Sequence, residues 1–166
     1  MNKAPRKGGQ TIKEVSIMYE QTDFYVAYGS NLSVEQMRYR CPGAKVYGKG
    51  VMKGWKLEFR THANIIPAPG SEVPVVVWKI TRQDRASLDR YEGYPRYYVR
   101  KIVEVQMEDG STEFCMVYVM TDKKKRIPPA CSYLATILEG YARFGFSPAP
   151  IAQALDDLEQ SLYDAM

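Results

Sequence analysis

The chain contains one histidine, His62, and three cysteines, Cys41, Cys115 and Cys131, among its 166 residues. A single histidine excludes two-histidine metal motifs and most zinc sites. No G-x-S-x-G nucleophile elbow is present, and the glycines of Gly48–Gly54 lack the spacing of a phosphate-binding loop. We therefore expect any chemistry to use carboxylate, phenol, amide and backbone groups, with no metal and no other cofactor.

Long hydrophobic runs are absent as well. No stretch approaches the roughly 20 apolar residues that span a bilayer, and residues 1–10 lack the apolar centre of a secretory signal. The odd number of cysteines includes no C-x-x-C pair, so free and mostly buried thiols in a reducing compartment are expected. These features predict a cytoplasmic protein that does not enter a membrane.

Positive charge is concentrated near the N-terminus. The net charge is +4 at pH 7, and the four basic residues within residues 1–13 account for all of it. We expect residues 1–22 to form a flexible basic tail, with an edge strand at Val15–Tyr19, and residues 23–166 to form one domain. A second basic run, Lys123–Arg126, is expected to be a solvated loop, so nucleic acid is not an expected partner. Nucleic-acid association through the two basic runs stays as an alternative, which salt-dependent retention of an oligonucleotide would support.

Hydrophobic patterning predicts strands with helices at irregular intervals. The predicted strands are Phe24–Tyr28, Val46–Arg60 (a bent strand or hairpin), Val73–Ile80, Tyr97–Met107 and Thr112–Thr121, with a short extended piece at Asn64–Pro67. The predicted helices are Val34–Arg40, Thr81–Tyr91, Ala130–Phe144 and Pro150–Tyr163, and the predicted turns are Ala68–Ser71 and Glu108–Ser111. This order indicates an α+β fold in which a mixed β-sheet curls into a small barrel with flanking helices.

The last predicted helix has an apolar stripe formed by Ile151, Leu155, Leu158 and Leu162. Such spacing is typical of a helix that buries one face. We expect the stripe to pack in the core or between two copies of the chain, which makes a homodimer a candidate assembly.

A polar turn follows the first predicted strand. Gly29 ends the strand and permits close approach to the backbone, while Ser30 and Asn31 add side-chain donors. Ser33 and Gln36 fit a capping box that opens the next helix. Backbone N–H groups and the positive end of a helix dipole would converge here, which suits an anion such as a carboxylate. An ordinary capped turn between a strand and a helix is the alternative interpretation.

A second candidate feature is the segment Leu88–Tyr98, at the end of a predicted helix. Gly93 suits the position after the helix, and Pro95 prevents its continuation. Glu92 therefore lies at the helix C-terminus, where the dipole disfavours a carboxylate, with four tyrosines near it in sequence: Tyr91, Tyr94, Tyr97 and Tyr98. We expect these surroundings to raise its pKa and to suit it to proton transfer near neutral pH. A solvated glutamate at a frayed helix end is the alternative.

Together, these segments resemble the gamma-glutamylcyclotransferases and the related gamma-glutamylamine cyclotransferases. The likeness rests on Tyr28–Leu32 and on Leu88-Asp89-x-x-Glu92-Gly93, and it continues in the same order through Pro74–Trp78, Met116–Met120 and Pro128–Tyr133. The proline at position 95 is typical of the gamma-glutamylamine branch, whereas Tyr28–Leu32 is closer to the branch that acts on gamma-glutamyl amino acids. The leaving group therefore stays open at this point.

The resemblance implies a barrel of the predicted kind and a small-molecule substrate with a gamma-glutamyl group. It implies conversion of a gamma-glutamyl amino acid or gamma-glutamylamine to 5-oxoproline and a free amino acid or amine, as in glutathione metabolism. It implies Glu92 as general base and then general acid. The substrate-binding residues that it implies are Tyr28, Gly29, Ser30, Asn31, Leu32, Tyr98, Tyr118 and Tyr133. A modified natural-product intermediate stays open as a substrate, and a non-catalytic module that binds a small molecule or partner is the rival function.

Overall fold

The computed structural model describes residue 11 and residues 23–121 and 125–166. The predicted tail and its edge strand lie outside the described residues apart from Thr11, as do Lys123 and Lys124 of the second basic run. The element order is β1 (Phe24–Ala27), the 3-10 helix η1 (Ser30–Leu32), α2 (Val34–Arg40), β2 (Lys45–Arg60), β3 (His62–Lys79), α3 (Arg82–Glu92), β4 (Tyr98–Met107), β5 (Thr112–Met120), α4 (Cys131–Phe144) and α5 (Ala149–Asp164).

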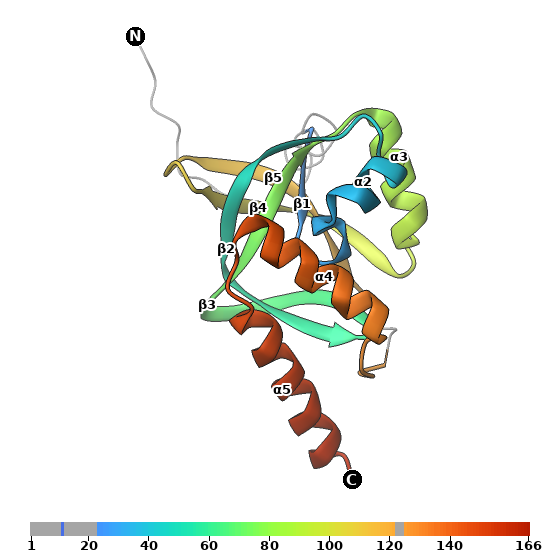
Figure 1. The fold of residues 1–166 in the computed structure, drawn as a ribbon, viewed down its shortest axis with the longest axis vertical. Helices are drawn as coiled ribbons and strands as arrows, with labels where there is room; N and C mark the ends of the chain where they lie inside the picture. Colours follow the sequence, from blue (N-terminus) through green and yellow to red (C-terminus); the bar gives the residue numbers. More distant parts are fainter. Residues whose placement is uncertain (1–10, 12–22, 122–124) are drawn as a thin grey trace.

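The strands close into a barrel in the order β1-β3-β2-β4-β5 (Figure 1). β1 and β5 are parallel where they close the barrel, with Tyr25 opposite Met116, and the other neighbouring pairs are antiparallel. Helices lie outside this mixed barrel, so the predicted α+β architecture is confirmed. The predicted hairpin β4–β5 is also present, since Gln106 pairs with Thr112 next to the turn.

β2 and β3 form one long hairpin instead of the several short strands that the sequence predicts. Arg60 pairs with His62 at the tip, and Thr61 between them adopts a φ of 68°. Val46–Arg60 belongs to a single bent strand, which resolves the choice between a strand and a hairpin. The extended piece predicted at Asn64–Pro67 and the strand predicted at Val73–Ile80 are both present, and they are parts of one strand, β3, where the sequence indicated a turn between them.

The predicted turn at Ala68–Ser71 does not reverse the chain. Pairing passes from Lys53 opposite Glu72 to Trp55 opposite Pro67, so four residues of β3 oppose a single residue of β2. A bulge of this kind increases the local twist and bends the strand. The proline and glycine residues of Ala68–Ser71 therefore lie in a bulge that bends β3 around the barrel.

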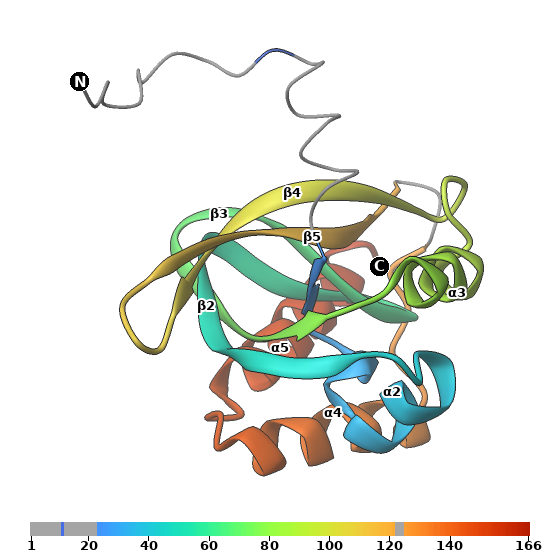
Figure 2. The same cartoon turned by 90° about the horizontal axis from the view of Figure 1, so that it is seen from above.

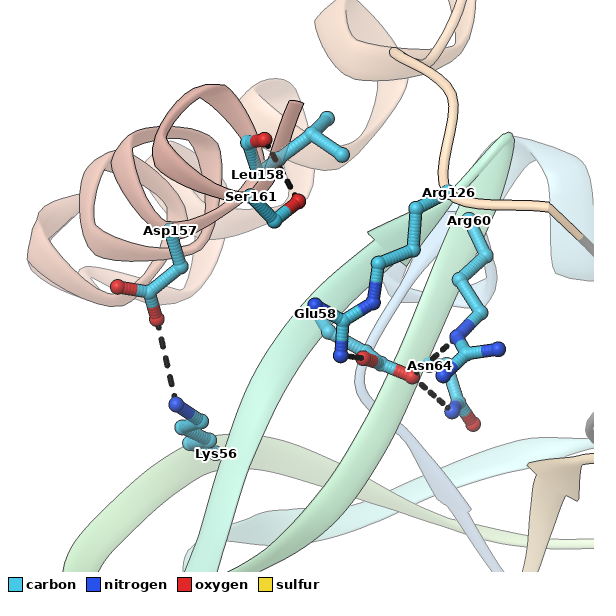
Figure 3. A network of polar contacts seen from close by, with 8 residues as sticks. All are labelled: Lys56, Glu58, Arg60, Asn64, Arg126, Asp157, Leu158 and Ser161. Carbon is cyan, nitrogen blue, oxygen red and sulfur yellow. Dashed lines mark hydrogen bonds and ion pairs between the residues drawn. The ribbon is translucent and has the colours of Figure 1, made fainter. Parts of the chain in front are cut away.

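α5 packs on β2, and its apolar stripe is only partly in the core. Ile151 and Leu158 are buried, whereas Leu162 is 38% exposed. A contact of 3.4 Å between Lys56 Nζ and Asp157 Oδ2 ties the helix to the strand (Figure 3). Within the described part of the chain, no helix has both the length and the apolar composition needed to cross a membrane.

α2, α3 and the beginning of α4 gather at one end of the barrel (Figure 2). η1 packs against α4 at a glycine, because a Cβ added at Gly140 would lie 2.5 Å from the Cβ of Leu32. This close approach fixes the polar turn that follows β1. The candidate site is built around that turn.

Candidate active site

A cavity of about 550 Å³ lies at this end of the barrel. It is lined by the turn after β1, the end of α3, the starts of β3 and α4, and side chains of β4 and β5. It brings Glu92 together with most of the predicted substrate-binding residues: Tyr28, Gly29, Ser30, Asn31, Tyr98, Tyr118 and Tyr133. Segments far apart in the sequence therefore meet around one space.

Leu32 is the predicted site residue that does not line the cavity. Its side chain is fully buried in the core, and its backbone N–H donates to the carbonyl oxygen of Gly29 at 3.0 Å. Gly140 of α4 lies directly against it. Leu32 therefore anchors the turn to the helix, and the expectation that it contacts substrate is not supported by its position.

The capping box predicted at the start of α2 is half formed. Ser33 Oγ accepts from the backbone N–H of Gln36 at 3.2 Å, as expected for an N-cap. The side chain of Gln36 points elsewhere, because its Nε2 donates to Oδ1 of Asn31 at 3.2 Å. Gln36 therefore supports the polar turn in addition to the helix.

Asn31 is buried, and its side chain is bonded to other protein side chains. Its Nδ2 donates to the hydroxyl of Tyr25 at 2.9 Å, and its Oδ1 accepts from Nη1 of Arg40 at 2.7 Å. A buried amide with these partners holds both side chains in fixed orientations. Asn31 thus positions the wall of the cavity.

The backbone of the turn offers a different set of donors. Across residues 23–121 and 125–166, the N–H groups of Ser30 and Asn31 donate to no backbone acceptor. Both residues line the cavity. Two adjacent N–H groups without a backbone acceptor in this part of the chain suit an oxygen that carries or develops negative charge.

Arg40 is a site residue that the sequence analysis did not identify. Its guanidinium carbon lies 3.2 Å from the ring centroid of Tyr91, and Arg40 lines the cavity. Burial lowers the pKa of Arg40, and the nearby carboxylate of Glu92 acts in the opposite direction. An arginine in the last turn of a helix ordinarily indicates only a favourable interaction with the dipole, so the sequence held no signal for this role.

Glu92 is the last residue of α3 and lies half-buried in the cavity wall. The predicted ends of this helix are confirmed: Thr81 and Asp84 form a reciprocal capping box, and Gly93 ends the helix with a φ of 64°. A Cβ at position 93 would lie 2.6 Å from the ring of Tyr97. Glycine is therefore required at this position, and it fixes the direction in which the chain leaves Glu92.

Of the four tyrosines near Glu92 in sequence, three line the cavity with it. These are Tyr91, Tyr97 and Tyr98. Tyr94 is not among the lining residues, and its ring centroid lies 4.2 Å from the guanidinium carbon of Arg100. Three of the four tyrosines that the sequence puts near Glu92 therefore share the cavity with it, and Tyr94 is the exception.

Buried phenols surround the carboxylate in space. Burial is the main cause that raises the pKa of Tyr25, Tyr28 and Tyr98, and the negative charge of Glu92 raises each further. Burial also raises the pKa of Tyr133 to about 12, again with a contribution from Glu92. These side chains are consequently neutral phenols at physiological pH.

Three tyrosine hydroxyls in the cavity wall, those of Tyr28, Tyr98 and Tyr118, donate to protein acceptors across the barrel. Tyr28 donates to the carbonyl oxygen of Tyr118 at 2.7 Å, and Tyr98 donates to that of Ala63 at 3.0 Å. Tyr118 donates to Oδ1 of Asp89 at 2.6 Å. Their contribution is to build a rigid, apolar wall.

Tyr133 differs because its oxygen accepts a hydrogen bond, from the backbone N–H of Ala63 at 2.9 Å. It also lies within hydrogen-bonding contact of Ser30 in the polar turn. Its ring packs edge-on against that of His62 at 4.9 Å between centroids. Tyr133 is therefore the predicted pocket tyrosine that connects α4 directly to the turn.

Asp89 ties the helix that carries Glu92 to the barrel. Besides its bond from Tyr118, it lies 3.7 Å from Nε of Arg100 on β4. Burial and the bond to Asp89 raise the pKa of Tyr118. The last turns of α3 are thus fixed to two strands.

A buried carboxylate, Glu58, organises the approach to α4 (Figure 3). Its side chain accepts from Arg60 Nε at 2.9 Å, from Asn64 Nδ2 at 2.8 Å and from Arg126 Nη2 at 3.4 Å. The contact with Arg126 holds the segment that leads into α4 to the barrel. No local pattern in the sequence indicated this cluster, which supports the part of the chain that precedes Tyr133 of α4.

The sequence and fold of the chain are similar to those of known cyclotransferases. The family described as gamma-glutamyl cyclotransferase, AIG2-like, matches residues 25–135. The chain belongs to this family, as the motif resemblance indicated.

The relatives have similar lengths as well as similar sequences. A gamma-glutamylcyclotransferase from Bos taurus is 32% identical over 152 residues, which cover 84% of this chain and 80% of the relative. One from Homo sapiens is 31% identical over 164 residues, which cover 91% and 86%. A solved structure named gamma-glutamyl cyclotransferase superposes with a TM-score of 0.69 at 31% identity, covering 82% of this chain and 85% of that one.

Proposed function

We propose that this protein is a gamma-glutamylcyclotransferase, an enzyme that releases 5-oxoproline from a gamma-glutamyl compound. The observation that carries the proposal is the cavity in which Glu92 lies with the polar turn around Ser30 and Asn31. The activity named in its relatives agrees with it. The free cysteines, of which Cys41 and Cys115 are buried, support a reducing cytoplasmic location.

The reaction is an intramolecular exchange of amide bonds. The α-amino nitrogen of the substrate attacks the γ-carbonyl carbon, a five-membered lactam closes, and the bond from that carbon to the leaving nitrogen breaks. The nucleophile and the electrophile belong to one molecule, so the enzyme's first task is to hold the chain folded for attack. A rigid cavity walled by buried phenols supports that task.

Glu92 is the proton carrier in this proposal. The α-amino group arrives as an ammonium, and the Glu92 carboxylate accepts one of its protons before attack. The resulting carboxylic acid then gives that proton to the leaving nitrogen as the amide bond breaks. The regenerated carboxylate carries the second proton of the attacking nitrogen to the released amine, which leaves as an ammonium. General acid–base help of this kind contributes typically about 10²–10⁴-fold to the rate.

The polar turn stabilises the negative charge of the tetrahedral intermediate. Ser30 and Asn31 line the cavity, and their N–H groups have no backbone acceptors among the described residues. Donors that are fixed before the reaction cost no reorganisation when charge develops on the γ-carbonyl oxygen. Tyr133 of α4 lies within hydrogen-bonding contact of Ser30, so it packs against the turn.

The test is a panel of gamma-glutamyl compounds incubated with the purified chain, with 5-oxoproline measured by mass spectrometry. The panel includes gamma-glutamyl amino acids and gamma-glutamylamines, so it reports the leaving group together with the activity. The matched α-glutamyl isomers are controls, because their amine is not placed to close the same lactam. Release from at least one gamma-glutamyl class is expected. Tight binding of 5-oxoproline without any release would instead indicate a binding module.

A further inference from the structure

We propose that Arg40 binds the α-carboxylate of the gamma-glutamyl group and thereby makes a free α-carboxylate a requirement for substrates. The inference rests on the proposed function, since the ligand is taken to be a gamma-glutamyl compound. It assigns a binding role to a residue outside both segments from which the family was recognised. It also gives the α-carboxylate and the γ-carbonyl oxygen of the substrate different partners, which the polar turn alone could not do.

Arg40 is held in place before any ligand arrives. One edge of the guanidinium is fixed by the 2.7 Å bond from Nη1 to Asn31 Oδ1, and the same nitrogen lies 3.5 Å from Ser30 Oγ. One face lies over the ring of Tyr91, 3.2 Å from its centroid. A long side chain that is already ordered loses little conformational entropy when it binds a ligand.

The rest of the guanidinium has donors to spare. Among the residues that the structure describes, none accepts a hydrogen bond from Nη2 or Nε of Arg40. The planar group still presents several N–H donors at the cavity. Such a fork matches the two oxygens of a carboxylate and can bind both of them at once.

The charges of the cavity fit the head of an amino acid. Its charged side chains are Arg40, Arg90 and Glu92, and Arg90 is an exposed residue whose Nη2 donates to Ser87 Oγ at 3.3 Å. A gamma-glutamyl group carries an ammonium and a carboxylate on one carbon atom. Glu92 suits the ammonium and Arg40 suits the carboxylate, and the two protein charges are near enough to influence each other.

This assignment leaves the backbone donors for the γ-carbonyl oxygen, which becomes anionic in the tetrahedral intermediate. If Arg40 takes the α-carboxylate, the N–H groups of Ser30 and Asn31 are available to that oxygen. Asn31 then has a double role, because its side chain fixes Arg40 while its backbone N–H has no backbone acceptor among the described residues. The substrate is held at both ends of the bond-forming segment.

The experiment compares two substrates in three enzymes. The substrates are gamma-glutamyl-alanine and its analogue in which the α-carboxyl of the glutamyl residue is a carboxamide. The enzymes are the wild type, Arg40→Gln, and Arg38→Gln as a control on an exposed residue of the same helix that does not line the cavity. Wild type and Arg38→Gln should prefer the carboxylate substrate in kcat/KM by about 10- to 100-fold, the range of a hydrogen bond to a charged group. In Arg40→Gln the preference should fall to nearly one.

The ratio between substrates separates binding from structural damage. A merely structural role of Arg40 would lower kcat/KM for both substrates alike and keep the preference, which would overturn the inference. Arg40→Lys should restore part of the preference, since an ammonium keeps the charge and loses the fork. A wild type that turns over both substrates equally would also overturn it, while leaving the proposed function standing.

A binding measurement gives a readout independent of turnover. 5-Oxoproline keeps the former α-carboxylate, so calorimetry should show that the wild type binds it more tightly than 5-oxoprolinamide, and that Arg40→Gln binds the two alike. Equal affinities in the wild type would contradict the role of Arg40. A wild type that releases no 5-oxoproline from any gamma-glutamyl compound would contradict the proposed function itself.

Discussion

The hydroxyl of Tyr118 donates a 2.6 Å hydrogen bond to Oδ1 of Asp89, which joins β5 to the helix that carries Glu92. Asp89 and Glu92 are three residues apart, so they lie one turn from each other on α3. A hydrogen bond to an ionised carboxylate is shorter and stronger than one between neutral groups. The position of the proposed proton carrier therefore depends on a contact between two elements that are distant in sequence.

Tyr118→Phe and Asp89→Asn should each lower the free energy of unfolding by about 1–3 kcal/mol, because a partly buried charge-assisted bond is weakened or lost. Each should also lower kcat, since α3 is no longer fixed against β5. The double variant should be only slightly worse than the worse single one, as expected for two partners of one contact. Urea unfolding and 5-oxoproline release measure the two effects, and strictly additive losses would show that the contact does not couple the residues.

Gly140→Ala should displace the polar turn around Ser30 and Asn31, because Gly140 of α4 packs against that turn. The added Cβ would lie 2.5 Å from that of Leu32, so either η1 or α4 must move. We expect a loss of about 1–3 kcal/mol in stability, typical of overpacking, and a larger relative loss of turnover because the polar turn shifts. Ala142→Ser, an exposed position on the same helix, is the control. A Gly140→Ala enzyme with unchanged kcat/KM would show that the turn does not need this contact.

Asn31→Ala should raise KM and lower kcat together, by roughly 10-fold or more in kcat/KM. It removes the acceptor that holds Arg40 and the donor to Tyr25, and each lost bond is worth about 0.5–3 kcal/mol. Ser30→Ala should have a smaller effect, because its Oγ is 3.5 Å from Arg40 and its backbone N–H is retained. Ser161→Ala on α5 is a remote control (Figure 3). Steady-state kinetics that match wild type in both variants of the turn would contradict its proposed role.

The sequence predicted the parts of the site whose signals are local. The ends of α3 follow from Thr81, Asp84 and Gly93, because capping and positive φ depend on a few neighbouring residues. The position of Glu92 at the helix end follows from the same residues. The ordered motifs predicted the family, and the family implied most of the cavity wall.

Long-range contacts were not predictable in the same way. Arg40 reaches the cavity because Asn31 and Tyr91 hold it there, and Glu58 is buried because its partners come from several segments. Residues 68–71 have a composition typical of a turn, but in the structure they form a bulge within the long β2–β3 pairing. In each case the position of the residue depends on contacts with residues distant in sequence, and a short stretch of sequence does not reveal those contacts.

The buried tyrosines make stability sensitive to alkali. The pKa of Tyr133 rises from its ordinary value of 10.0 to about 12 on folding, and the pKa values of Tyr25, Tyr28 and Tyr98 are also raised. The folded state holds these protons more tightly than the unfolded state, so their contribution to stability is complete below pH 10. It is lost as the pH rises toward the folded values.

Urea midpoints measured between pH 8 and pH 12 should therefore be level up to about pH 10 and then fall. Tyr133→Phe should show a shallower fall, because one of the titrating phenols is removed. A stability that is flat to pH 12 would contradict the burial of these hydroxyls.

The role of Glu92 is tested most directly by turnover of a gamma-glutamyl substrate in Glu92→Gln, with Glu139→Gln on the exposed face of α4 as the matched control. Glutamine keeps the size and hydrogen bonding of the side chain and cannot carry a proton between two nitrogens. We expect 5-oxoproline release to fall at least about 100-fold while affinity for 5-oxoproline is largely kept, and the control to match wild type. Near-normal release by Glu92→Gln would show that another group moves the proton.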